Sequence, residues 1–61
     1  MIELGNEIST KLREKRARKK ITLLEASKEI GISSKTLSLI ENDKLIKVKK
    51  TIYQKLVEWL I

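Results

Sequence analysis

The feature that most constrains this 61-residue chain is a very short turn between two segments of helical character. A helix is expected to open at Thr22, because Glu25 follows at the spacing at which the two side chains can cap each other's backbone amides. Gly31 is the residue best able to adopt the left-handed conformation that ends a helix, and Ser33 is a favoured cap for the next helix. Only about three residues then separate two helices, which must cross steeply.

Two further helices are expected on either side of this pair. Asn6 is the expected N-cap of a helix that runs to about Arg18 and carries Leu12 on its inner face. A fourth helix is expected from about Lys49 onward, with an apolar stripe that can close the core. That stripe contains Ile52, Tyr53, Leu56, Val57 and Leu60.

The helix after the turn should extend from Ser33 to about Glu41, with Leu37 and Ile40 facing inward. The basic stretch 44–50 is expected to be a loop or helix lead-in outside the core. The chain contains no proline and almost no alternation of β-branched residues, so helical periods dominate. These patterns predict an all-α chain, folded as a compact four-helix bundle that forms a single domain over residues 1–61.

Composition excludes several classes of function. Without cysteine or histidine the chain has no disulfides and none of the common metal sites, so we expect no metal and no cofactor. No nucleophile can be paired with a base, which argues against an enzyme with catalytic residues. No apolar run approaches the roughly 18 residues that span a membrane, and the N-terminus does not read as a signal peptide, so a cytoplasmic protein is expected. The net charge of +6 favours nucleic acid as partner over an anionic membrane surface.

The order of these segments resembles the helix-turn-helix of the phage repressor and Cro family, also called the XRE family. The similar stretches are LREKRARKKIT, TLLEASKEIGIS and SKTLSLIEN, which together span residues 12–42. The resemblance implies a bundle like that of the lambda repressor, with a short fifth helix as the alternative to four helices. It also implies a buried structural ion pair between Arg16 and Glu41.

In this family the third helix lies in the major groove of double-stranded DNA, and its N-terminal residues meet base edges. The resemblance therefore implies that the leading base readers are Ser34, Lys35 and Thr36, followed one turn later by Ser38 and Leu39. Lys35 can donate to guanine O6 and N7, or contact a phosphate without reading sequence. Phosphate contacts are expected at helix N-termini and in the basic loop, at Thr22, Asn42, Lys44, Lys47, Lys49 and Lys50.

Leucines stand at two positions that are often polar in this family. Leu23 replaces a side chain that touches the DNA backbone, and leucine cannot donate a hydrogen bond. Leu39 has three readings: contact with a thymine methyl group, packing into the core, or formation with Leu23 of an apolar patch for a protein partner.

Two other positions also depart from the family pattern. Ala26 is smaller than the usual core residue, so Leu24 or Ile21 is expected to fill the space. Asp43 replaces a frequent glycine; aspartate tolerates the left-handed conformation, but its charge is unfavourable near DNA.

The apolar C-terminal end suggests a homodimer, since family members commonly bind palindromic operators as two-fold dimers. The interface candidates are Trp59, Leu60 and Ile61, with Ile2 and Leu4 at the other end of the chain. The alternative for Trp59 is that it covers the chain's own core. The leading functional hypothesis is a Cro-like repressor of a phage or mobile element. The second is a protein-interaction module with the same fold, either an antirepressor or antitoxin-like.

Overall fold

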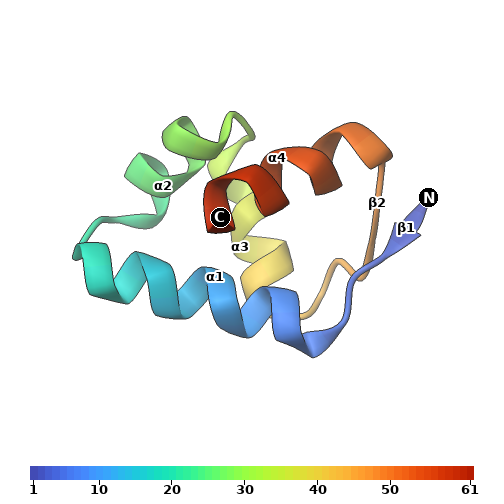
Figure 1. Ribbon diagram of the computed structural model, residues 1–61, viewed down its shortest axis with the longest axis horizontal. Helices are drawn as coiled ribbons and strands as arrows, with labels where there is room; N and C mark the ends of the chain where they lie inside the picture. Colours follow the sequence, from blue (N-terminus) through green and yellow to red (C-terminus); the bar gives the residue numbers. More distant parts are fainter.

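The computed structural model describes all residues, 1–61, and contains four helices and a two-stranded sheet (Figure 1). Their order is β1 (Ile2–Glu3), α1 (Asn6–Lys19), α2 (Leu23–Ile30), α3 (Ser34–Glu41), β2 (Lys47–Val48) and α4 (Lys50–Leu60). In Figure 1, α3 runs from the end of α2 towards α1, and α4 packs across α1 and α2. The four predicted helices are present, and there is no fifth helix.

The all-α prediction is wrong in one respect, because β1 and β2 pair in an antiparallel sheet. Ile2 lies opposite Val48, and Glu3 lies opposite Lys47. Val48 is only 2% exposed and belongs to the core, so the stretch 44–50 is more than a basic lead-in. Its lysine neighbours point the other way, as the period of two in a strand requires. A strand of two residues is too short for this alternation to stand out in the sequence.

The core forms from side chains of every helix, from Val48 of β2 and from Leu4, which follows β1. Leu12 and Leu37 are fully buried, as expected, and Ala26 is buried without help from Leu24, which is 54% exposed. Ile21 packs against the core instead. The buried apolar residues are Leu4, Leu12, Ala26, Ile30, Leu37, Ile40, Val48 and Leu56. Because Leu4 is among them, it is not available for a dimer interface.

Local hydrogen bonds fix where the helices begin. The capping box of α2 is confirmed: the Glu25 amide donates to Thr22 Oγ1 at 3.1 Å, and the Thr22 amide donates to Glu25 Oε1 at 2.9 Å. The predicted cap of α1 is wrong, since Gly5 holds the N-cap position and Asn6 is the first helical residue. No side chain caps that end, so the Asn6 side chain does not accept the backbone hydrogen bond expected of an N-cap.

Candidate nucleic-acid interface

The turn between α2 and α3 depends on two small residues, the C-cap Gly31 and the N-cap Ser33. Gly31 has a φ of +92°, a left-handed conformation that glycine adopts at no steric cost. The amides of Gly31 and Ile32 both donate to the Ser27 carbonyl oxygen, at 2.8 and 3.1 Å, which closes the end of α2. Ser33 then caps α3 by accepting from the Thr36 amide at 3.1 Å. These bonds hold α3 steeply across α2.

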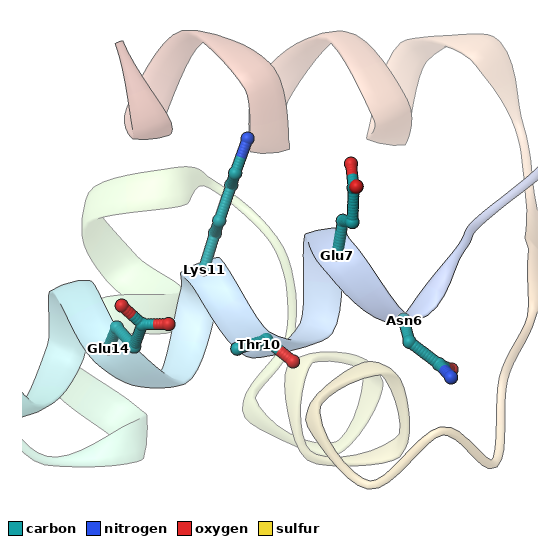
Figure 2. A pocket seen from close by; sticks show the side chains of 5 residues that line it. All are labelled: Asn6, Glu7, Thr10, Lys11 and Glu14. Carbon is teal, nitrogen blue, oxygen red and sulfur yellow. The ribbon is translucent and has the colours of Figure 1, made fainter.

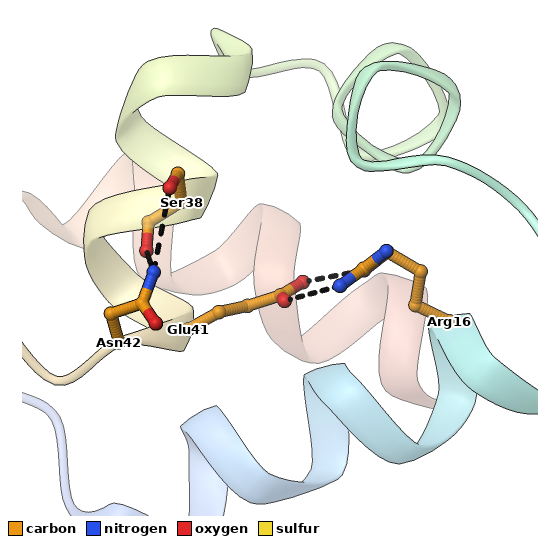
Figure 3. A network of polar contacts seen from close by, with 4 residues as sticks. All are labelled: Arg16, Ser38, Glu41 and Asn42. Carbon is orange, nitrogen blue, oxygen red and sulfur yellow. Dashed lines mark hydrogen bonds and ion pairs between the residues drawn. The ribbon is translucent and has the colours of Figure 1, made fainter.

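A bidentate ion pair joins the last residue of α3 to α1 (Figure 3). Arg16 Nε donates to Glu41 Oε2 at 3.1 Å, and Arg16 Nη2 donates to Glu41 Oε1 at 3.0 Å. The Glu41 side chain is 5% exposed, so its charge is compensated inside the protein. The guanidinium of Arg16 is therefore committed to the fold and cannot be counted among the groups that face DNA.

Two lysines of the basic run from Arg13 to Lys20 are also engaged in contacts within the chain. Lys15 donates to the carbonyl oxygen of Trp59 and lies 4.9 Å from the centre of its ring. Lys19 pairs with Glu29 at 2.6 Å, and Trp59 Nε1 donates to the same carboxylate at 3.0 Å. Trp59 thus joins α4 to α1 and α2 and covers the chain's own core, the alternative to a role in dimerisation.

One face of α3 is turned outward and carries all five expected base readers. Lys35 is exposed, and Ser34, Thr36, Ser38 and Leu39 are partly exposed, while Leu37 and Ile40 lie in the core. The Ser33 hydroxyl donates to Thr36 Oγ1 at 2.7 Å, which leaves the Thr36 hydroxyl proton free for another acceptor. Asn42 Nδ2 donates to the Ser38 carbonyl oxygen at 2.8 Å, so the Asn42 side chain lies back along α3 (Figure 3).

The leucines at unusual positions have different environments. Leu23 packs against the core, which explains why its place in α2 needs no polar group. Leu39 is partly exposed and is not among the side chains packed against the core. The exposed leucine of α2 is Leu24, so of the two residues expected to fill the space beside Ala26 only Ile21 packs against the core. Leu24, and not Leu23, is therefore the leucine that α2 exposes.

Four lysines whose ammonium groups make no hydrogen bond or ion pair within the chain lie beyond α3. Lys44, Lys47, Lys49 and Lys50 are all exposed, and none donates a side-chain hydrogen bond. Thr22 is also exposed, but its amide is occupied by Glu25, so only its hydroxyl proton can reach a phosphate. The capping box that identifies α2 thus removes one expected backbone donor.

The other candidate features of the chain contribute no site. The one hollow, of about 350 Å³, lies along the outer surface of α1 and is lined by five polar residues of that helix (Figure 2). A hollow lined by a single helix lacks the converging groups of a ligand site. No group of acidic side chains is placed to hold a metal ion. None of the helices combines the length and the apolar character needed to cross a bilayer.

Two glutamates of α2 make stability dependent on pH. The hydrogen bond from the Thr22 amide lowers the pKa of Glu25, and hydrogen bonds from Lys19 and Trp59 lower the pKa of Glu29, from an ordinary value of 4.5. Since both pKa values are lower in the folded state, the stabilisation is present above the unfolded value and is lost as pH falls through the folded values.

We therefore expect the free energy of unfolding to fall from about pH 5 to pH 3, and to fall less in the double variant Glu25→Gln/Glu29→Gln. Urea unfolding followed by circular dichroism across this range measures the difference. Glu14→Gln, on the exposed side of α1, is the matched control and should keep the wild-type slope. A double variant with the same slope as the wild type would contradict the expectation.

The helices α2 and α3 cross steeply and are joined by a tight turn. One side of α3 packs against the core and the other side is exposed, and this arrangement defines a helix-turn-helix domain. In comparison with known families, residues 11–56 match a family described as a helix-turn-helix domain, and the chain belongs to that family. Membership indicates DNA as the partner. Searches of curated proteins and of solved structures found no match.

Proposed function

We propose that this protein is a sequence-specific transcriptional regulator, a Cro-like repressor of a phage or mobile element, that places α3 in the major groove of double-stranded DNA. The observation that carries the proposal is the contrast between the two faces of α3. The inner face ends in the Arg16–Glu41 ion pair, whereas the outer face offers hydroxyls, one ammonium group and one leucine to base edges. The net charge of +6 supports a polyanionic partner.

The proposal assigns distinct roles along this surface. Ser34, Lys35, Thr36, Ser38 and Leu39 would read bases, with Lys35 donating either to guanine or to a phosphate. The free lysines after α3, with Asn42 and the Thr22 hydroxyl, would contact phosphates and set affinity and register. Hydroxyls pair with several bases, so discrimination would be modest at each position.

We further propose a cytoplasmic, single-domain protein of the lambda-repressor type that binds a palindromic operator as a homodimer. Half-sites would lie about one helical turn apart, which matches the two-fold symmetry of such dimers. Ile61 supports an interface near the end of α4, because it is 93% exposed. Trp59 and Leu60 are engaged with the core and would form the base of that interface rather than its contact surface.

Selection of duplexes from a random pool by the purified protein, at about physiological salt, tests the function directly. Enrichment of a two-fold symmetric site is the expected result. A folded, helical protein that enriches no sequence would overturn the proposal.

The second candidate, a protein-interaction module, is favoured by the apolar side chains that α2 and α3 leave exposed. Leu24 and Leu39 are the residues concerned. Replacing each with glutamine distinguishes the two functions, since loss of sequence preference in Leu39→Gln supports readout. Preserved DNA binding in both variants, together with loss of a protein partner, would favour the module.

A thymine methyl group is the expected contact of Leu39. Burying one such group contributes about 0.8 kcal/mol, so replacing the contacted thymine with deoxyuridine should weaken wild-type binding about four-fold. The Leu39→Ala variant should not distinguish the two duplexes. Fluorescence anisotropy with the selected site measures both affinities, and deoxyuridine outside the site is the control. Equal losses for wild type and variant would show that Leu39 does not make the contact.

A further inference from the structure

Asp43, the acidic residue directly after the C-cap of α3, is held by a buried hydroxyl of α1. Ser9 is 2% exposed, and its Oγ donates to Asp43 Oδ1 at 2.7 Å. The Ser9 hydroxyl also lies 3.0 Å from the Asn6 carbonyl oxygen, within α1 itself. A hydroxyl has only one proton, and a carboxylate is the stronger acceptor, so the shorter bond across to Asp43 is the dominant one.

The conformation of Asp43 shows why this bond matters locally. The backbone of Asp43 has a φ of +57°, in the left-handed region that residues other than glycine adopt at a cost in free energy. Backbone hydrogen bonds also hold the turn: the Asp43 amide donates to the Ile40 carbonyl oxygen at 3.1 Å, and the amides of Lys44 and Leu45 both donate to the Leu39 carbonyl oxygen, at 2.9 and 3.1 Å. None of these bonds involves the Asp43 side chain. The Ser9 hydroxyl therefore offsets the strain at Asp43.

This turn sets the direction in which the chain leaves α3. Asn42 precedes Asp43, and Lys44, whose exposed ammonium group has no partner in the chain, follows it. Further on, the loop is tied down again where the Leu4 amide donates to the Ile46 carbonyl oxygen at 2.6 Å. Lys44 lies in the segment between these two attachments and is exposed.

We propose that Ser9 and Asp43 are positioning residues for DNA binding, which hold Asn42 and Lys44 against the phosphates on one side of the groove. This inference rests on the proposed function. It also explains an acidic side chain beside phosphate contacts: the Asp43 carboxylate is drawn towards α1 by Ser9, and its role there outweighs the repulsion of its charge.

Three variants separate positioning from simple charge repulsion in titrations of the selected duplex at several salt concentrations. Ser9→Ala leaves the charge but removes the bond, so affinity should fall several-fold and the slope of log K against log salt should become shallower by about 1, for one lost phosphate contact. Asp43→Asn keeps the acceptor and tolerates the left-handed turn, so it should bind at least as tightly as wild type. Asp43→Gly removes charge and acceptor together, and should bind several-fold less tightly than Asp43→Asn.

Ser27→Ala is the matched control. Its hydroxyl is equally buried and donates within α2, to the Leu24 carbonyl oxygen at 2.7 Å, so its loss should leave the salt slope unchanged. Equal binding by Asp43→Gly and Asp43→Asn, with no effect of Ser9→Ala, would overturn the positioning role. Failure of the wild-type protein to bind any duplex would overturn the proposed function instead.

Discussion

Arg16→Ala should lower the free energy of unfolding by about 3 kcal/mol, because it strands the buried Glu41 carboxylate without its partner. A domain of this size has a free energy of unfolding near the lower end of the usual range, about 5 kcal/mol, so most of the stability would be lost. Urea unfolding followed by circular dichroism measures the change. Arg13→Ala removes the same side chain from an exposed position of α1 and should cost less than about 0.5 kcal/mol.

A double variant tests the cause of this loss. If the cost arises from an uncompensated buried charge, Arg16→Met/Glu41→Leu should recover most of the stability lost in Arg16→Ala, since apolar pairs often replace buried ion pairs without penalty. Similar small losses in Arg16→Ala and Arg13→Ala would show that the Arg16–Glu41 pair contributes no more than a surface contact.

Binding of one protein chain to its half-site should weaken about 150-fold between about 50 and 200 mM salt, if four lysines each neutralise one phosphate. The four candidates are Lys44, Lys47, Lys49 and Lys50, whereas Thr22 and Asn42 are neutral and would contact phosphates without releasing counterions. The expected slope of log K against log salt is roughly −4 per chain. Affinities from fluorescence anisotropy across a salt series provide the slope.

A pair of lysine variants shows whether the lysines after α3 are responsible for the salt dependence. Lys47→Gln removes a free ammonium group and should make the slope shallower by about 1. Lys19→Gln removes the same charge from a lysine that is paired with Glu29, and should leave the slope nearly unchanged. If the two variants changed the salt slope equally, the total charge of the protein, and not the lysines after α3, would set the affinity.

The sequence was sufficient to predict the parts of the fold that depend on local chemistry. The capping box at Thr22, the left-handed Gly31 and the cap at Ser33 each act within one turn of chain, and the boundaries of α2 and α3 followed from them. The sheet did not follow, because Ile2 and Val48 pair across most of the chain and each strand has only two residues. No local pattern records such a pairing.

For the site, the sequence indicated which side chains lie on the outer face of α3 but not which charges remain free. The net charge includes Lys15, Lys19 and Arg16 in the same way as the lysines after α3. All three, however, make hydrogen bonds or ion pairs with other residues of the chain. Their partners come from α2, α3 and α4, and only tertiary packing brings these elements to α1. The hydrogen bond between Ser9 and Asp43 was missed for the same reason, since it joins residues 34 positions apart.

The pairing of β1 with β2 has a practical consequence for anyone who prepares this protein. Since Glu3 lies beside Lys47, an affinity tag fused ahead of Met1 would emerge next to the lysine loop (Figure 1). An acidic tag there would screen the lysine ammonium groups that are proposed to contact phosphates. A fusion after Ile61 leaves this pairing untouched but follows the residue proposed for the dimer interface, so a tag at either end should be removed before DNA binding is measured.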